Sequence, residues 1–243
     1  MKFVDEGIVL SLKKYSENSI ILKVFTQNRG VCAGLVKESS FSKKNKYAFQ
    51  IGDLIQVSWV ARNESDLGTF QAEPIKSYSN LVFDSSFKSY LLQFIVNLLL
   101  GIFHEKQNEE NFYNSFIEFL KLLNQENDIK IILVKYVKLE LLLLEVLGIG
   151  LDFSECAISK DKNNLCYISP KTGQAVSKGV GFLYKNKLFD LPEFLIDCDV
   201  DCDKEDILQG LKITGYFLKK YLQENNEKVI KSLSFYRNKF LMF

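Results

Sequence analysis

The sequence predicts an α+β chain with more than one domain, in which a five-stranded β-barrel precedes a helical bundle with an irregular insertion. Three observations predict this fold class. Short segments of alternating character, separated by polar turns, fill residues 6–77. Long segments with helical periodicity follow from residue 84, and a stretch with glycines and prolines interrupts them at about 151–192. We expect a barrel domain over residues 1–79 and a helical domain over residues 80–243.

The barrel strands are expected where apolar residues alternate or cluster between turn residues. Five segments fit: Gly7–Leu12, Ser19–Thr26, Val31–Val36, Leu54–Arg62 and Thr69–Lys76. The turn residues Gln27 to Gly30 predict that the second and third strands form a hairpin. Five short strands of this size fit an OB-type barrel, a recurrent oligonucleotide-binding scaffold, and they fit an SH3-like barrel equally well.

The helices are expected where apolar residues recur at three- and four-residue spacing. A first helix begins at the N-cap candidates Asp84 to Ser86, and a second covers Glu109–Leu123. A third covers Asp128–Leu147, with Gly148 suited to end it. A last long helix runs from Asp203 to Gln223, and the tail from Lys228 carries four basic residues and no acid.

Positive charge is concentrated in the barrel segment. The chain has a net charge of +1, but residues 23–62 hold seven basic and two acidic residues and therefore carry +5. Three lysines, Lys43, Lys44 and Lys46, fall close together in a serine-bearing loop between the third and fourth strands. Such a loop can bind an anionic polymer by charge, and the alternative, a solvated surface loop with no partner, is the commoner case for this segment taken alone. The candidate DNA-binding residues are Arg29, Lys37, Lys43, Lys44, Lys46 and Arg62.

The sequence gives little support to catalysis, cofactors or a metal. There is no phosphate-binding loop, no GxGxxG motif and no nucleophile motif beside the single histidine, His104. The five cysteines do not form two C-x2-C pairs, because Cys156 is followed at that spacing by Ser159. The odd cysteine count and the absence of a signal peptide favour free thiols in a reducing compartment. The aspartates of residues 197–203 lack the glycine and the distal glutamate of a calcium loop, so we expect a solvated acidic loop.

The chain resembles the RecO family of bacterial recombination mediators over essentially its whole length. The resemblance is carried by several segments in order: Asp5–Leu10, Gly52–Leu54, Val57–Trp59, Gly148–Phe153, Cys156, Tyr167–Gly173, Ala175–Ser177, Leu191–Pro192 and Lys231–Leu233. Those after residue 148 are similar to the α-proteobacterial branch. Some members carry two C-x2-C pairs in this region, and Cys156 stands where the first would begin, whereas Ser159 and the region of Ser177 lack the other thiols. This departure from the family pattern implies a zinc-free member.

The resemblance implies a cytoplasmic, non-enzymatic protein that binds single- and double-stranded DNA and anneals complementary strands. Its implied partners are RecR and the C-terminal tail of single-strand-binding protein, and it would help RecA indirectly; it implies no cofactor and no membrane. The alternative from another class is a protein-interaction adaptor with weak nucleic-acid binding, RNA included. Salt-dependent binding to single-stranded DNA and to RNA of equal length would separate these hypotheses.

Overall fold

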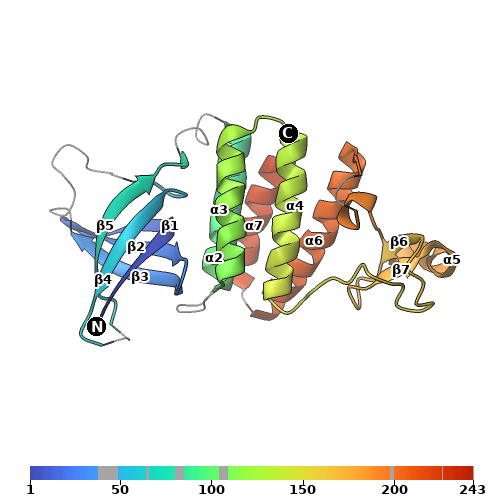
Figure 1. Ribbon diagram of the computed structural model, residues 1–243, viewed down its shortest axis with the longest axis horizontal. Helices are drawn as coiled ribbons and strands as arrows, with labels where there is room; N and C mark the ends of the chain where they lie inside the picture. Colours follow the sequence, from blue (N-terminus) through green and yellow to red (C-terminus); the bar gives the residue numbers. More distant parts are fainter. Residues whose placement is uncertain are drawn as a thin grey trace. The chain divides into compact units, whose positions relative to one another are not determined.

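The computed structural model describes most of the chain, and Figure 1 shows its elements in sequence order. The described residues are 1–37, 49–63, 66–79, 85–103, 109–197, 200–225 and 227–242. Contacts between residues divide the chain into two compact units, Met1–Gln125 with Asn226–Phe243, and Glu126–Asn225. The expected division into domains at residues 79 and 80 is not tested by these contacts and stays a prediction.

The first unit begins with a closed five-stranded barrel, as the sequence predicts (Figure 1). Its strands are β1 (Lys2–Ser16), β2 (Ser19–Thr26), β3 (Gly30–Lys37), β4 (Leu54–Val60) and β5 (Thr69–Lys76). They close in the order β1-β2-β3-β5-β4, and all neighbours are antiparallel except β3 and β5, which pair in parallel at Leu35 and Thr69. This order, with its single parallel closing pair, is that of the OB-fold rather than of an SH3-like barrel.

β1 is longer at both ends than the predicted strand Gly7–Leu12. Its first half pairs with β4 from Lys2 to Ile8, and its second half pairs with β2 from Gly7 to Ser16. A strand that pairs with two neighbours along different halves must be long. Because its outer face meets solvent, the polar pair Lys13-Lys14 continues the strand instead of ending it. β4 is shorter than predicted and ends at Val60, two residues before Arg62.

Alternate side chains of the strands fill the barrel. The buried core consists of Val9, Leu22, Val24, Cys32, Val36, Phe49, Ile55, Val57, Trp59 and Phe70. The carboxylate of Asp53 is also buried, and it accepts hydrogen bonds from Gln50 N at 2.8 Å, Ser77 Oγ at 2.8 Å, Tyr78 N at 3.0 Å and Ser79 N at 3.1 Å. These bonds tie the start of β4 to the end of β5, so a buried charge fixes the closure of the barrel.

Among the described residues, three helices complete the first unit: α2 (Ser86–Ile102), α3 (Glu110–Gln125) and α7 (Glu227–Phe240). The outward-facing ring of Phe25 on β2 packs against the helices, with centroids 5.2 Å from Phe103 and 6.1 Å from Phe112. The helix α7 packs along α2. The expectation that the helix from Asp203 to Gln223 is the last one was wrong, because the basic tail from Lys228 lies in α7, where the Arg237 guanidinium lies 5.6 Å from the ring centroid of Phe94.

The second unit contains two long helices and a small sheet. The helices are α4 (Ile129–Val146) and α6 (Lys204–Asn225). Gly148, two residues after the end of α4, has a φ of +74° that suits glycine. The two helices pack on each other around the buried carboxylate of Glu140, which accepts hydrogen bonds from the hydroxyls of Tyr136 and Thr214.

The predicted irregular insertion of this unit contains short strands and helices. It consists of β6 (Leu165–Ile168), β7 (Ala175–Ser177), α5 (Lys178–Gly181), η2 (Phe182–Lys187), β8 (Phe189–Asp190) and η3 (Glu193–Leu195), with sheet order β7-β6-β8. Within the described residues, no helix has the length and apolar character that crossing a membrane requires.

Candidate nucleic-acid interface

Three lysines share the outer face of β1, β2 and β3. In the strand register, Lys23 pairs with Ser11 and Ala33, Lys13 pairs with Ile21, and Lys37 pairs with Ser19. Because side chains alternate along a strand and Leu22, Val24 and Val36 point into the core, Lys13, Lys23 and Lys37 point outward. We call these three residues the basic face.

The basic face lies beside the part of the sheet that the helices cover. Phe25 and its cross-strand partners Ile8 and Val31 are buried, and Phe25 contacts the helices. The next outward pairs hold only small, apolar or basic residues: Ser11, Lys13, Ser19, Ile21, Lys23, Ala33, Leu35 and Lys37. No carboxylate stands among these positions to neutralise the lysines, so the face can attract an anionic polymer.

The structure separates the sequence-predicted basic residues. Arg29 and Lys37 lie at opposite ends of β3, an eight-residue strand that spans roughly 25 Å. Arg62 follows β4 and lies at the connection to β5. Lys43, Lys44 and Lys46 lie outside the described residues, as does His104, so their placement in the site stays a prediction.

Arg29 has a defined aromatic environment at the start of the barrel. Its guanidinium carbon lies 4.5 Å from the ring centroid of Phe3, and this ring stacks on Trp59 at 5.3 Å. The turn that carries Arg29 is fixed by Asn28, whose backbone N–H and side-chain amide donate to the carboxylate of Asp5. A guanidinium over a ring face can still donate its N–H groups to a phosphate.

Sequence reasoning missed Lys13 as a candidate, and it counted Lys23 only toward the local charge. Both belong to the basic face, whereas Arg29 and Arg62 do not. Alternation along the second strand was the signal that could have found Lys23, since it lies between the core residues Leu22 and Val24 and therefore points outward. Lys13 could not be placed in this way because the first strand was expected to end before it.

The second unit holds a polar site around a buried sulfur. The Sγ atom of Cys156 accepts hydrogen bonds from Ser159 N at 3.4 Å and Ser177 N at 3.3 Å, and the two serine hydroxyls lie 3.3 Å apart. Burial raises the pKa of this thiol, but the hydroxyls and backbone N–H groups of Ser159 and Ser177 outweigh burial and lower the pKa to about 6. Cys156, Ser159 and Ser177, the three positions that the resemblance connected with a zinc site, therefore lie in contact with one another.

The described residues around Cys156 do not form a metal site. Within the described part of the chain, no three His, Cys, Asp or Glu side chains gather as ligands, and Cys32, Cys156, Cys166 and Cys202 are free thiols. Cys198 lies outside the described residues. The absence of zinc stays a prediction.

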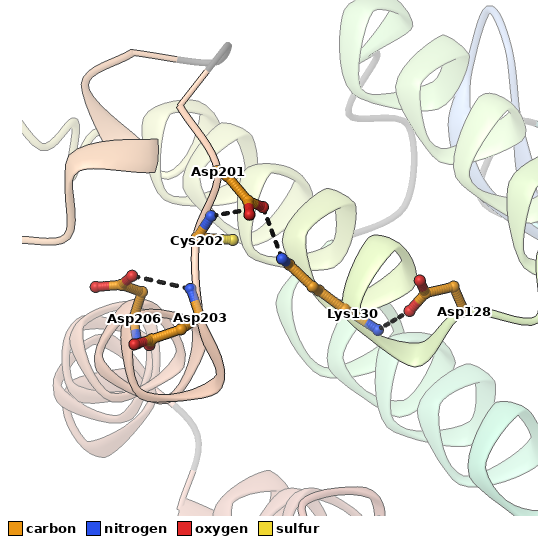
Figure 2. Close-up of polar contacts among 6 residues, drawn as sticks. All are labelled: Asp128, Lys130, Asp201, Cys202, Asp203 and Asp206. Carbon is orange, nitrogen blue, oxygen red and sulfur yellow. Dashed lines mark hydrogen bonds and ion pairs between the residues drawn. The ribbon is translucent and has the colours of Figure 1, made fainter.

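The acidic segment around Asp201 caps helices and forms an ion pair (Figure 2). Asp201 binds Lys130 Nζ at 2.6 Å, and this contact lowers the pKa of Asp201 and raises that of Lys130. Asp203 and Asp206 exchange backbone N–H bonds at the start of α6, and Asp128 accepts from Lys130 N at the start of α4. The described carboxylates thus stabilise the starts of α4 and α6.

Known proteins match the chain along nearly its full length. The family described as "Recombination protein O N terminal" matches residues 1–78, and the family "Recombination protein O C terminal" matches residues 84–229. A protein named "DNA repair protein RecO" from Ehrlichia chaffeensis is 40% identical over 239 residues, which cover 95% of each chain. Its namesake from Rickettsia canadensis is 37% identical and covers 93% of this chain and 91% of its own. Matches to both halves in order, on a barrel of OB topology, show that the chain belongs to the RecO family.

Proposed function

We propose that this chain is a DNA-binding recombination mediator that anneals complementary strands and catalyses no covalent reaction. The role in DNA repair rests on membership of the RecO family. The finer part of the proposal comes from the resemblance: the protein binds single- and double-stranded DNA, works with RecR, and engages the C-terminal tail of single-strand-binding protein. In this way it assists RecA in loading onto coated single strands, with no cofactor.

The observation that carries the proposal is the acid-free basic face, Lys13, Lys23 and Lys37, on a barrel of OB topology. Lys37 is the last residue of β3, and the segment with Lys43, Lys44 and Lys46 follows it directly in sequence. A lysine ammonium is a point charge without the bidentate fork of arginine, so it suits phosphate contact better than base reading. Binding of this kind accepts any sequence.

Backbone binding of this kind is what strand annealing needs. Two single strands repel each other through their phosphates, and lysines on a protein surface neutralise part of that charge. Contacts to phosphate leave the Watson–Crick edges of the bases unoccupied, so a second strand can pair with the bound one. Annealing makes and breaks no covalent bond. It needs only positive charges held on a rigid sheet.

The proposal predicts that the triple variant Lys13→Ala, Lys23→Ala, Lys37→Ala loses affinity for single-stranded DNA in a salt-dependent manner. If each lysine makes one phosphate contact, the slope of log K against log salt should fall by about two, because each contact contributes about 0.7 for single strands. Fluorescence anisotropy with a labelled oligonucleotide at several salt concentrations measures the slope. The rate of annealing of two complementary oligonucleotides should fall in parallel.

The matched control is the triple variant Lys121→Ala, Lys219→Ala, Lys220→Ala, which removes the same charge from exposed positions on α3 and α6. It should leave the slope nearly unchanged. Equal losses in the two triple variants would show that the protein attracts DNA diffusely, and the assignment of the basic face would then be wrong.

A second candidate is the protein-interaction adaptor. An observation in the second unit favours it, namely the exposed apolar side chains of Phe182, Leu183 and Tyr184 at η2. As an adaptor, the chain would bind DNA weakly and with a shallow salt slope. Measuring the same slope with RNA of equal length separates a DNA mediator from a general nucleic-acid binder.

A further inference from the structure

The short helix η2 exposes two aromatic rings in the second unit. It contains Phe182, Leu183 and Tyr184, and none of its residues is buried. Phe182 is 59% exposed, Leu183 82% and Tyr184 55%. Aromatic rings usually belong to a core or an interface, because each ring removes a large apolar area from water when it is covered. Exposed rings of this kind therefore mark a place where another molecule binds.

The segment that carries the rings is held at both of its ends. Lys178 N donates to Asn164 O at 2.9 Å before the rings, and Leu191 N donates to Cys166 O at 2.9 Å after them. Between these bonds, a Cβ atom at Gly181 would come within 2.3 Å of an aromatic ring of β6. The backbone therefore packs closely on β6, and the exposure of η2 is a feature of the fold rather than fraying.

Positive charge surrounds the rings. From residue 162 to residue 189 the sequence holds five lysines and no acidic residue, and all five lysines are exposed. Lys185 Nζ lies 5.4 Å from the ring centroid of Phe182, and Lys171 and Lys187 line a pocket together with Tyr184. A segment with this charge attracts an anionic polymer.

The pocket beside η2 has room for one nucleobase. Its volume is about 340 Å³, and the ring of Tyr184 contributes to its lining. The lining also includes the apolar residues Pro170 and Leu188, which suit the flat face of a base, and the hydroxyl groups of Ser169 and Thr172, which can form hydrogen bonds with its edge. Rings, hydroxyls and lysines together match the bases and phosphates of a single strand.

We propose that η2 and its pocket form a second site for single-stranded DNA, in addition to the basic face. We define the second strand site by Phe182 and Tyr184 with Lys171, Lys185 and Lys187. Bases stack on the two rings, one of them in the pocket, and the lysines contact the phosphates. Duplex DNA gains no such stacking, because its bases already stack on one another inside the helix.

This inference rests on the proposed function and extends it, because annealing brings two strands together. A chain with one strand site on each unit can hold both strands in one complex. A chain with a single site must wait for the second strand to arrive from solution. Binding the second strand to the same chain raises its effective concentration near the first and therefore speeds annealing.

The test uses the full chain without the lysines of the basic face and of the segment that follows β3. All six are replaced by alanine: Lys13, Lys23, Lys37, Lys43, Lys44 and Lys46. Fluorescence anisotropy with a labelled oligothymidylate should detect saturable binding to this sixfold variant, and the matching duplex should bind roughly tenfold more weakly. Loss of all single-strand binding would overturn the inference and leave the proposed function untouched.

Two further changes in the sixfold variant locate the binding on the rings. The pair Phe182→Leu, Tyr184→Leu removes both π-faces and no charge, so it should weaken single-strand binding by roughly tenfold or more without changing the salt slope. Its control is Leu183→Ala, which shortens the most exposed apolar side chain of η2 and should leave the affinity nearly unchanged. The inference is wrong if the ring pair has no effect. It is also wrong if Leu183→Ala weakens binding as much, because the surface would then bind apolar protein segments rather than bases.

A pair of lysine substitutions in the same variant tests the phosphate contacts. Lys185→Ala, Lys187→Ala should lower the slope of log K against log salt by about 1.4, because each contact contributes about 0.7 for single strands. The control pair Lys219→Ala, Lys220→Ala removes the same charge from exposed positions of α6 and should leave the slope nearly unchanged. Equal losses in the two pairs would show diffuse attraction and would overturn the inference.

Strand annealing separates this inference from the proposed function. With all other residues unaltered, the pair Phe182→Leu, Tyr184→Leu should keep the salt slope that the basic face provides but anneal complementary oligonucleotides roughly tenfold more slowly. An unchanged rate, with slow annealing only in the basic-face triple variant, would support the proposed function and reject the second strand site. Slow annealing in the ring pair alone would support the second strand site and reject the basic face.

Discussion

The thiol of Cys156 lies in a polar environment that stabilises its charged form. Backbone N–H groups of Ser159 and Ser177 point at its sulfur, and they stabilise a negative charge there. Two serines therefore supply the N–H donors that stabilise a thiolate at this one sulfur.

This environment predicts a pH-dependent contribution to stability. The pKa of Cys156 is about 6 in the folded state and 9.0 in a free thiol, so between these values the unfolded chain holds a proton that the folded chain has lost. The contribution is therefore fully present above pH 9 and is lost as the pH falls through 6. Urea unfolding under reducing conditions should show the unaltered chain gaining stability over Cys156→Ser as the pH rises from 6 to 9.

The control for this prediction is Cys202→Ser. Burial raises the pKa of Cys202 above that of a free thiol, so between pH 6 and about 8 its thiol stays protonated in both states and contributes almost no slope. Parallel stability curves for Cys156→Ser and the unaltered chain would show that the Cys156 thiol keeps its proton in the folded state.

At the scale of single residues, the sequence identified basic residues but not their positions on the barrel. Arg29, Lys37 and Arg62 were recognised as basic, yet they lie on different parts of the barrel. Lys13 was missed because the strand that carries it continues past two lysines that were expected to end it. The outcome depended on the hairpin register with β2, in which Lys13 pairs with Ile21, and the residue types at the end of β1 do not show this register.

At the scale of elements, α7 is the helix that sequence did not predict. Its residues are mostly polar, and its helical state depends on packing along α2, more than a hundred residues earlier in the chain. Isolated helices of this length are marginal in water, so tertiary contact decides whether they form. By contrast, β2 and β5 have the bounds that were expected, because their alternation and flanking turns are local signals.

The packing of α7 on α2 predicts a stabilising role for the C-terminal segment. Ending the chain at Asn225 should expose part of α2 around Phe94 and lower the free energy of unfolding by roughly 2–4 kcal/mol, since burying one large apolar side chain contributes about 1.5–3 kcal/mol. Urea denaturation followed by circular dichroism measures the change. An unchanged midpoint after the deletion would contradict this role for α7.

Two point variants on α7 refine this test. Arg237→Ala removes the contact with the buried ring of Phe94 and should cost about 1 kcal/mol. Lys239→Ala removes a contact with the exposed ring of Phe235 and should change stability by less than about 0.5 kcal/mol. Arg237 is for this reason a poor control for net charge in DNA-binding experiments, whereas Lys219 and Lys220 serve that purpose.

At the scale of the whole molecule, two surfaces of different chemistry lie on different units. The basic face belongs to the barrel in the first unit, and the second strand site belongs to the segment around the small sheet in the second. Composition suggested a basic barrel segment, because charge is visible in sequence. It did not suggest the second strand site, because Phe182, Leu183 and Tyr184 look like core residues until the fold shows that they are exposed.

The last prediction concerns how far the basic surface of the barrel extends. The triple variant Lys43→Ala, Lys44→Ala, Lys46→Ala should lower the salt slope by about two, as the basic-face triple variant should. If the two sets of lysines contact different phosphates, combining all six substitutions should lower the slope by about four and abolish strand annealing. The loss should be the same for every DNA sequence, because phosphate contacts carry no base information. Weaker binding of single-stranded DNA at the second strand site should survive all six substitutions, since the second unit is unchanged. If the slope falls by only about two in the combined variant, both sets of lysines contact the same phosphates. The DNA path would then end at the edge of β3 and would not cross the outer face of the barrel.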